Sequence, residues 1–294
     1  MAHLMGAEVI THEFPTKEVF SGVTVGINDG DRIGIVGRNG DGKSTLVKIL
    51  TKQFAPDSGR VTWRGGLRIG FLTQVDVIDD EISIAEAVVG DRPEFEWASD
   101  PKIRDVLSGL VADLDWHQKV GTLSGGQRRR VALAALLAGE YDVVFLDEPT
   151  NHLDVDGVAW LANHLQTRWP KNVGGLAVIT HDRWFLDAVC NLTWEVYGGR
   201  IEPFEGGYAA YVQQRAERSR QADAIESRRQ NLLRKELAWL GRGAPARTAK
   251  PKFRIDAALA LIGNEPPPRN SVELAKLATT RLGKDVLDME DVSY

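Results

Sequence analysis

Cysteine and long apolar stretches are both scarce in this sequence. The 294 residues include one cysteine, Cys190, so the chain cannot form an internal disulfide or a cysteine-rich zinc site. No run approaches the roughly 18 apolar residues that a membrane-spanning helix requires. The opening MAHLMGAEVITHEF has no basic stretch followed by an apolar one, so it does not resemble a secretory signal peptide. We therefore expect a cytoplasmic protein without membrane insertion.

An excess of positive charge is also absent from the chain as a whole, which has 36 Lys and Arg residues against 41 Asp and Glu. The net charge is −5, which by itself gives no indication of nucleic-acid binding. The segment from Gln214 to Arg254 differs, because it holds 12 Lys and Arg residues against 4 acidic ones. Its net charge of +8 leaves −13 on the rest of the chain. A basic segment on an acidic body is typical of phosphate-backbone contacts, and a solvated helix face is the alternative interpretation.

The apolar patterns predict an α/β domain. Patterns typical of strands occur at AEVITHEF, VTVGI, RIGIVG, RVTW, LRIGFL, VVFLD and LAVIT. VVFLD and LAVIT are continuous apolar runs, which indicates parallel strands covered on both faces. Helical patterns occur at STLVKIL and over residues 80–120, where Pro93 and Pro101 are expected to interrupt. We expect helices between the strands and a small helical insert.

The pattern changes after Gly207. Residues from Tyr208 to Leu240 are rich in Arg, Gln, Ala, Glu and Leu and contain no Pro or Gly, which predicts one long helix. Gly241 and Pro245 end it, and a second, less regular helical stretch follows. The final VLDMEDVSY returns to a strand-like pattern.

A glycine-rich segment, GRNGDGKST, fits the P-loop pattern G-x-x-x-x-G-K-[ST] between a predicted strand and a predicted helix. The glycines allow backbone N–H groups to face phosphates, and the helix N-terminus adds partial positive charge. Lys43 is expected to reach the β- and γ-phosphates, and Ser44 to place its hydroxyl on Mg²⁺. The predicted nucleotide-binding residues here are Gly37, Arg38, Asn39, Gly40, Asp41, Gly42, Lys43, Ser44 and Thr45.

An acidic pair ends the predicted strand VVFLD, within VVFLDEPTNHLD. The carboxyl end of a strand in an α/β sheet is where such folds bind ligands. Asp147 is expected to hold Mg²⁺, mostly through water. Glu148 is expected to orient and deprotonate the attacking water.

A third motif, LSGGQ at Leu123–Gln127, precedes three arginines and the helical run VALAALLAG. With the P-loop and the acidic strand end, this set resembles the ATP-binding cassette (ABC) superfamily. The family order is P-loop, Q-loop, LSGGQ, Walker B, D-loop and His-switch. Gln74 matches the Q-loop, Asp154 the D-loop and His181 the His-switch. The resemblance covers residues 1 to about 205.

The resemblance implies a P-loop NTPase fold of α/β class, with a mixed sheet and a helical subdomain at about 76–135. It implies an ATPase that uses ATP and Mg²⁺. Phe14, 29 residues before Lys43, matches the aromatic that stacks on adenine. In the family, two cassettes face head to tail, and each binds the other's nucleotide through LSGGQ. The implied roles are catalysis by Glu148, His181 and Gln74, Mg²⁺ binding by Ser44, Gln74 and Asp147, and nucleotide contacts from Phe14, Ser124, Gly125, Gly126, Gln127 and Asp154.

The form DEPTNHLD resembles the ABC-F group, whose members carry two cassettes on one chain and no membrane domain. EGGYAAYVQQRAERSR and the residues after it resemble the helical-hairpin linker between those cassettes, most nearly in the Uup-like branch. We therefore expect an ATPase domain at 1–205, a basic helical linker at 206–283 and the start of a second cassette at 284–294. Such a chain is expected to hydrolyse ATP weakly by itself.

In that family the linker reaches toward tRNA on the ribosome. The resemblance thus implies a ribosome-associated protein acting on translation, with residues 208–280 contacting tRNA or rRNA. Two alternatives stay open. One is the ATP-binding subunit of a membrane exporter, which the long basic linker and DEPTNHLD disfavour. The other is a DNA-associated ATPase.

Overall fold

The computed structural model describes residues 2–15, 17–72 and 78–241. The chain divides into two compact units, Met1–Glu217 and Arg218–Tyr294. The strands are β1 (His3–Phe14), β2 (Lys17–Asn28), β3 (Arg32–Gly37), β4 (Ser58–Trp63), β5 (Ile69–Leu72), β6 (Val143–Asp147), β7 (Gly175–Ile179), β8 (Leu192–Tyr197) and β9 (Arg200–Glu205). The α-helices are α1 (Lys43–Leu50), α2 (Ile84–Val89), α3 (Glu94–Trp97), α4 (Pro101–Leu110), α5 (Gly125–Ala138), α6 (Val155–Thr167), α7 (Arg183–Val189) and α8 (Tyr208–Gly241), and a 3₁₀ turn spans Val120–Thr122.

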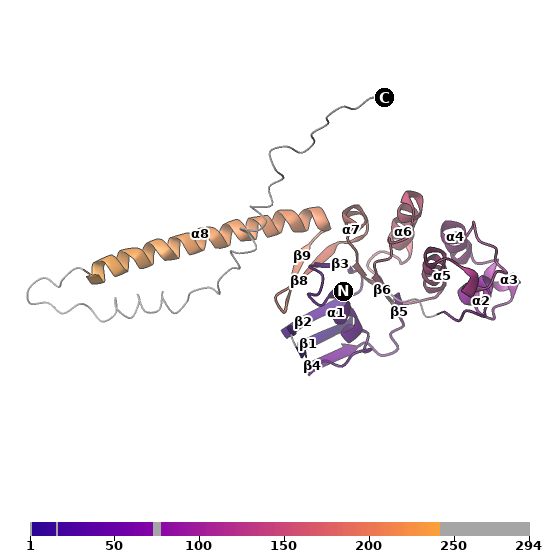
Figure 1. The fold of residues 1–294 in the computed structure, drawn as a ribbon, viewed down its shortest axis with the longest axis horizontal. Coiled ribbons are helices and arrows are strands. Elements are labelled where there is room, and N and C mark those ends of the chain that lie inside the picture. The colour runs from indigo at the N-terminus through magenta and orange to yellow at the C-terminus, as the bar shows by residue number, and fades with distance from the viewer. Residues whose placement is uncertain (1, 16, 73–77, 242–294) are drawn as a thin grey trace, which may run out of the picture. The chain divides into compact units, whose positions relative to one another are not determined.

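A six-stranded sheet forms the centre of the first unit (Figure 1). Its order is β5-β6-β7-β3-β8-β9. Adjacent strands from β5 to β8 are parallel, and β9 pairs antiparallel to β8. The sheet is therefore mixed, as expected. The apolar runs did not predict β8 and β9, because β9 carries Pro203 and three charged residues on an edge strand.

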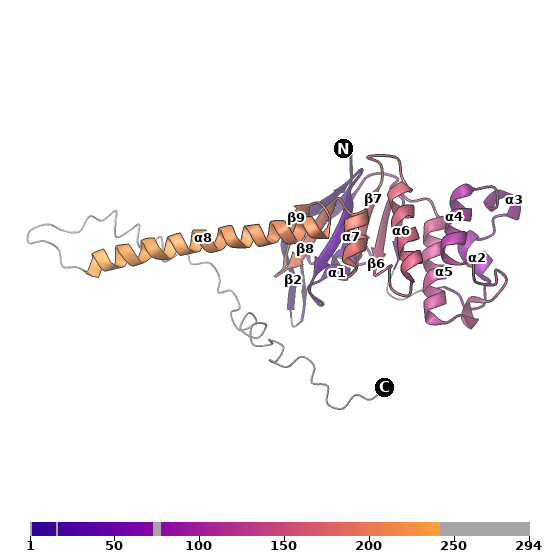
Figure 2. The same ribbon diagram turned by 90° about the horizontal axis from the view of Figure 1, so that it is seen from above.

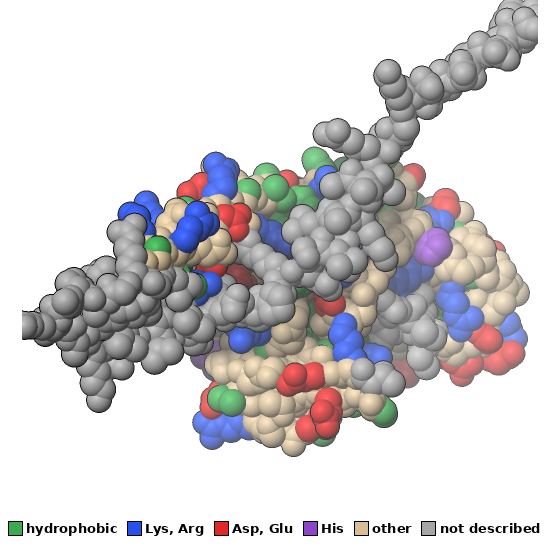
Figure 3. Space-filling view, turned by 60° about the vertical axis from the view of Figure 1, so that its left-hand side comes forward, with side chains coloured by type: hydrophobic (Ala, Val, Ile, Leu, Met, Phe, Trp, Pro, Cys, Tyr) green, Lys and Arg blue, Asp and Glu red, His purple; other side chains and the backbone are tan. Residues whose placement is uncertain are grey.

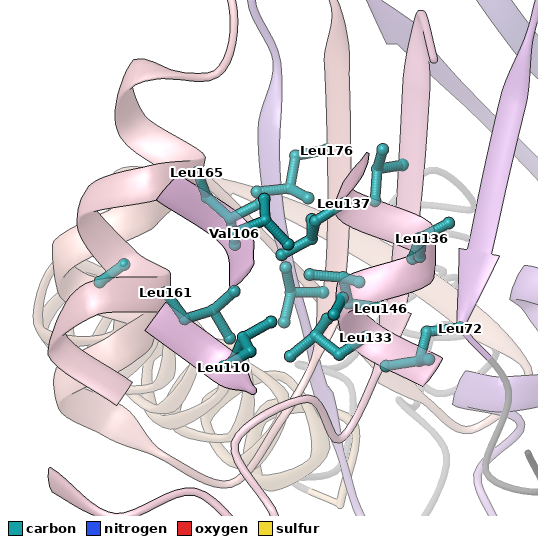
Figure 4. Close-up of a cluster of buried hydrophobic side chains, with 14 of the residues drawn as sticks. Leu72, Val106, Leu110, Leu133, Leu136, Leu137, Leu146, Leu161, Leu165 and Leu176 are labelled. Carbon is teal, nitrogen blue, oxygen red and sulfur yellow. The ribbon is translucent and has the colours of Figure 1, made fainter. Parts of the chain in front are cut away.

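Each central strand separates two hydrophobic cores, as the apolar runs predicted. In β6 the side chains of Val143 and Phe145 join one core, and those of Val144 and Leu146 join the other. This alternation is the period of two of an extended chain. Figure 4 shows the second core, where Leu146 meets Leu133 of α5 and leucines of α4 and α6. Because both faces are covered, the strand ends are the part of the sheet open to a ligand.

A separate three-stranded antiparallel sheet, β2-β1-β4, covers the other core. Its buried residues, such as Ile10, Phe20 and Ile27, pack with Leu46 and Ile49 of α1. The sheet and α1 thus share one core on one face of the six-stranded sheet. This packing places Phe14, at the end of β1, close to the start of α1.

Helices α2 to α5 form a helical group at the β5 and β6 end of the sheet (Figures 1 and 2). Pro93 immediately precedes α3, and Pro101 is the first residue of α4. Both prolines interrupt the helical pattern as predicted, because proline fits the first turn of a helix but not its interior. The side chains of Ser83 and Asp100 cap the N-termini of α2 and α4 by accepting hydrogen bonds from the backbone N–H groups of Glu86 and Lys102.

The long helix predicted after Gly207 is present as α8. Its first turn is fixed within the first unit, because Asp187 accepts the Ala209 N–H at 2.8 Å and Tyr211 donates its hydroxyl to Glu195 at 2.9 Å. The second helical stretch and the strand-like residues 284–294 lie outside the described residues. Over the part of the chain that the structure describes, no helix is both long and apolar enough to cross a membrane.

A buried histidine makes stability depend on pH. The His164 imidazole of α6 is buried, and its Nδ1 lies 2.9 Å from Asp105 of α4. Burial lowers the pKa of His164 below 6.5, and Asp105 only partly offsets this. The unfolded chain therefore takes up a proton first as pH falls, so the native state loses stability below about pH 6.5.

We expect His164→Gln to remove this dependence. The difference in unfolding free energy between wild type and His164→Gln should be largest above pH 6.5 and shrink toward pH 5. Urea unfolding at several pH values measures it. A difference that stays constant or grows on acidification would contradict this expectation, because the pKa of His164 in the folded chain would then not lie below its value in the unfolded chain.

Candidate functional site

Three adjacent parallel strands, β6, β7 and β3, end at the same edge of the sheet. The P-loop follows β3, Asp147 ends β6, and His181 comes two residues after β7. Strand order therefore brings together three motifs that are more than 30 residues apart in sequence. This edge is where open α/β sheets bind ligands.

The P-loop turns into α1 at Gly42, which has a φ of 102° and precedes the first helical residue. A side chain is strained in that conformation. A Cβ at this position would also lie 2.3 Å from Cγ1 of Val19 on β2. Both backbone conformation and packing therefore require glycine here.

The lysines at the loop are held by backbone carbonyls. Nζ of Lys43 donates to the carbonyls of Gly37 at 2.9 Å and Arg38 at 3.1 Å, so the ammonium group lies over the loop. Lys17 of β2 donates to the Gly40 carbonyl at 2.8 Å and lies 3.3 Å from Asp41. Two positive charges thus border a loop that opens at a helix N-terminus, an arrangement that favours anions.

The residues at the end of β6 fit a divalent cation. Ser44 donates its hydroxyl to Oδ2 of Asp147 at 2.8 Å. Asp147 is 3% exposed, and its Oδ1 is buried without a hydrogen-bond partner among the described residues. A buried carboxylate oxygen without a partner is costly, and a hydroxyl beside a carboxylate is a donor set that suits Mg²⁺. Ser44 and Asp147 therefore lie together, and the binding of Mg²⁺ by them stays a prediction.

Glu148 follows with a φ of +50°, unusual for a non-glycine residue. Its N–H donates to the Ile179 carbonyl at 2.7 Å, and its Oε1 lies 3.4 Å from Nε2 of His181. Burial raises the pKa of the Glu148 carboxyl, and His181 partly offsets this. A raised pKa brings a carboxylate closer to the range in which a general base works at neutral pH. The backbone strain and this pairing are consistent with a reactive position.

A cavity of about 440 Å³ joins these groups, and we call it the P-loop cavity. It is lined by Phe14, Lys17, Val19, Asn39, Gly40, Gly42, Lys43, Ser44, Thr45, Asp147, Glu148, Ile179 and His181. Phe14 is 43% exposed, and its ring is in T-shaped contact with the His12 ring at a centroid distance of 5.0 Å. Gly37, Arg38 and Asp41 line a second cavity of about 410 Å³, which shares Lys43 and His181 with the P-loop cavity.

The LSGGQ residues lie elsewhere. Ser124 caps α5 in a capping box, in which the Gln127 side chain accepts the Ser124 N–H at 2.9 Å. Asp154 caps α6 through the Gly157 N–H at 2.8 Å. A cavity of about 450 Å³, which we call the signature cavity, is lined by Gly109, Asp113, Ser124, Gly126, Gln127, Arg130, His152, Leu153, Asp154 and Gly157. Among the described lining residues, none is shared with the P-loop cavity.

One predicted site residue is not tested by the structure, and two residues of the P-loop cavity were not predicted. Gln74 lies outside the described residues, so its role stays a prediction. Lys17 and Val19 line the P-loop cavity, although neither belongs to a motif recognised in the sequence. Both residues are on β2, and only the fold shows that β2 packs over Gly42 of the P-loop. In the sequence, only the short distance from Phe14 to Lys17 could have indicated a role for Lys17 at the nucleotide, and a single lysine is a weak indication.

Comparison with known proteins agrees with this architecture. Two family models, each described as ABC transporter, match residues 20–151 and 194–268. An uncharacterized ABC transporter ATP-binding protein, YfmR of Bacillus subtilis, is 34% identical over 98% of this chain and 51% of its own length. The energy-dependent translational throttle protein EttA of Haemophilus influenzae is 32% identical over 95% of this chain and 56% of its own. The chain spans about half the length of these curated relatives.

Solved structures show the same fold. The complex of the archaeal ribosomal stalk protein aP1 with the ribosome recycling factor aABCE1 aligns with a TM-score of 0.63 at 26% identity, covering 73% of this chain and 42% of that one. An ATP-binding subunit of an ABC transporter aligns with a TM-score of 0.59 at 18% identity, covering 69% of this chain and 90% of that one. The predicted fold class is confirmed, and the chain belongs to the ATP-binding cassette (ABC) family.

Proposed function

We propose that this chain binds Mg-ATP and hydrolyses it as one of the two cassettes of a cytoplasmic ABC-F protein of the Uup-like branch. The observation that carries the proposal is the separation of the P-loop cavity from the signature cavity. Each is half a nucleotide site, and a second cassette facing this one head to tail would complete both. Relatives twice as long as this chain support the same view.

The residues of the P-loop cavity have separate roles in the transfer of the γ-phosphoryl group to water. Mg²⁺, when bound by Ser44 and Asp147, neutralises charge on the phosphates. Lys43 contacts the β- and γ-phosphates, and Phe14 stacks on the adenine. Glu148 accepts the proton of the attacking water, and His181 holds the water and the γ-phosphate in position.

ATP hydrolysis by this chain tests whether a second cassette is required. We expect residues 1–294 to bind Mg-ATP and to hydrolyse it slowly, since no LSGGQ faces the bound nucleotide. If two copies pair head to tail, the total rate in dilute solution should rise with the square of protein concentration, so the rate per site should rise in proportion to concentration. Adding a separate second cassette should also raise the rate per site. Turnover at dilute concentration equal to that of a two-cassette chain would contradict the proposal.

We further propose that the protein acts on the ribosome through its basic linker. On α8, side chains of Arg220, Arg228 and Lys235 are exposed, and helical spacing distributes the basic residues around the helix. Figure 3 shows acidic and basic side chains interspersed over the visible face. The count of charges places +8 between Gln214 and Arg254 and −13 on the rest of the chain. Two proteins similar to this one carry translational throttle and ribosome recycling in their names.

Co-sedimentation tests this partner. The Glu148→Gln variant, held with ATP, is expected to sediment with ribosomes, and binding should fall steeply as salt rises, because phosphate contacts release counterions. Replacing Arg220, Arg228 and Lys235 by Gln should weaken binding and reduce that salt dependence, while leaving ATP affinity unchanged. Association with membranes alone would favour the exporter alternative, and association with DNA alone the DNA-associated ATPase.

A further inference from the structure

Three consecutive arginines follow LSGGQ, and each joins α5 to a different element. Arg128 donates to the Ile78 carbonyl and pairs with Asp80, ahead of α2. Arg130 makes two bonds to Asp113, at 2.7 and 2.8 Å, after α4. These two contacts hold the helical group together. The middle arginine does something different.

Arg129 is directed into the body of the domain. Its side chain is 7% exposed, and its Nη2 donates to the backbone carbonyl of Asp147 at 2.5 Å. Asp147 ends β6, and its own carboxylate accepts the Ser44 hydroxyl in the P-loop cavity. A buried guanidinium on the LSGGQ helix therefore contacts the backbone of the opposite half-site.

The carbonyl that Arg129 binds belongs to the peptide unit joining Asp147 to Glu148. The N–H of the same peptide unit donates to the Ile179 carbonyl of β7 at 2.7 Å. Both polar ends of one peptide plane are thus held, and the next residue, Glu148, has a φ of +50°. The direction of the Glu148 side chain depends on this plane, because a peptide unit rotates as a rigid body.

Helix α5 is a continuous helix from Gly125 to Ala138. Its N-terminus is closed by the capping box of Ser124 and Gln127, and its length packs on β6 through Leu133 and Leu146 (Figure 4). Ser124 borders the signature cavity, while Arg129 lies a little over one turn further along the same helix. A displacement at the signature cavity therefore reaches the Asp147 carbonyl through a single rigid element.

We propose that Arg129 is a positioning residue for the general base, acting through the Asp147–Glu148 peptide, and that it couples the two half-sites of one cassette. A nucleotide bound to LSGGQ shifts α5, and Arg129 passes that shift to Glu148 at the P-loop. The inference rests on the proposed function for the roles of Glu148 and LSGGQ. The contacts that carry it are independent of those roles.

Arg129→Met tests the coupling by removing the donor while keeping a long side chain. Arg128→Met is the matched control on the same helix, because Arg128 lines neither the P-loop cavity nor the signature cavity. In single-turnover hydrolysis, we expect Arg129→Met to lower the rate about 10- to 100-fold, the scale of a slightly misplaced catalytic group. The Kd for Mg-ATP should stay unchanged, and Arg129→Lys, which keeps one donor, should recover part of the rate. Arg128→Met should leave the rate within a few fold of wild type.

A double-mutant cycle identifies the route. If Arg129 acts through Glu148, Arg129→Met lowers the rate in wild type but has no further effect in the Glu148→Gln background. An equal loss in both backgrounds would overturn the inference, because it would show a general structural effect. A chain that fails to bind Mg-ATP at all would instead contradict the proposed function.

Hydrogen exchange gives a readout that needs no turnover. The Glu148 amide, bonded to Ile179, should exchange faster in Arg129→Met than in wild type, since one end of its peptide is released. Arg128→Met should leave the exchange of the Glu148 amide unchanged. An unaltered Glu148 amide in Arg129→Met would overturn the inference, even if the hydrolysis rate fell.

Discussion

Glu148→Gln is expected to lower the single-turnover rate of ATP hydrolysis by roughly 10²- to 10⁴-fold, the usual contribution of a general base. The amide keeps the shape of the side chain but cannot take a proton from water. Removing a partly buried negative charge beside the phosphate site should leave the Kd for Mg-ATP equal or lower. Quench-flow hydrolysis and titration with a fluorescent ATP analogue measure the two quantities separately.

Asp156→Asn is the matched control for Glu148→Gln. Asp156 is an exposed carboxylate in the first turn of α6, outside the residues that line the P-loop cavity. Its loss should leave both the rate and the Kd near their wild-type values. If Glu148→Gln hydrolyses ATP at the wild-type rate, the general base is a different residue.

Gly42→Ala is expected to abolish measurable Mg-ATP binding. The added methyl group would lie 2.3 Å from Val19, and alanine is strained at a φ of 102°. Overpacking costs about 1–3 kcal/mol and the backbone strain about 1–2 kcal/mol more, so the loop and the start of α1 must shift. Such a shift moves Lys43 and Ser44 away from their predicted phosphate and Mg²⁺ contacts. Calorimetric titration measures the loss.

Gly40→Ala separates strain from packing. Gly40 also has a positive φ, of 82°, but a Cβ there would meet nothing within 4 Å. We expect Gly40→Ala to weaken Mg-ATP binding only a few fold, because the substitution strains the backbone at a positive φ but creates no steric clash. Equal effects of the two variants would show that the contact with Val19 does not define the loop.

The sequence predicted the strands that carry the motifs, because those strands are buried on both faces and read as continuous apolar runs. It also predicted α8, where Pro and Gly are absent over 33 residues. It did not predict β8 and β9. The apolar residues of β8 are interrupted by Thr193 and Glu195, and the Glu195 carboxylate is buried because Tyr211 and Arg215 of α8 contact it.

The motifs predicted where the site lies, but they did not predict the hydrogen bonds between its residues. Ser44 and Asp147 were predicted for Mg²⁺ separately, and the 2.8 Å bond between them depends on strand order. Gln127 was predicted for nucleotide binding, and in the structure its side chain completes a helix cap. Arg129 shares its residue type with both neighbours, so only the fold distinguishes the one that contacts Asp147.

The central claim is that this chain supplies one P-loop for one ATP, and calorimetric titration tests it most directly. The account predicts one Mg-ATP bound per chain, with binding weakened when EDTA removes Mg²⁺ and lost in Lys43→Ala. Lys48→Ala, which alters a lysine on the same helix outside the P-loop cavity, should bind like wild type. Absence of binding by the folded wild-type chain, or unchanged binding by Lys43→Ala, would contradict the account.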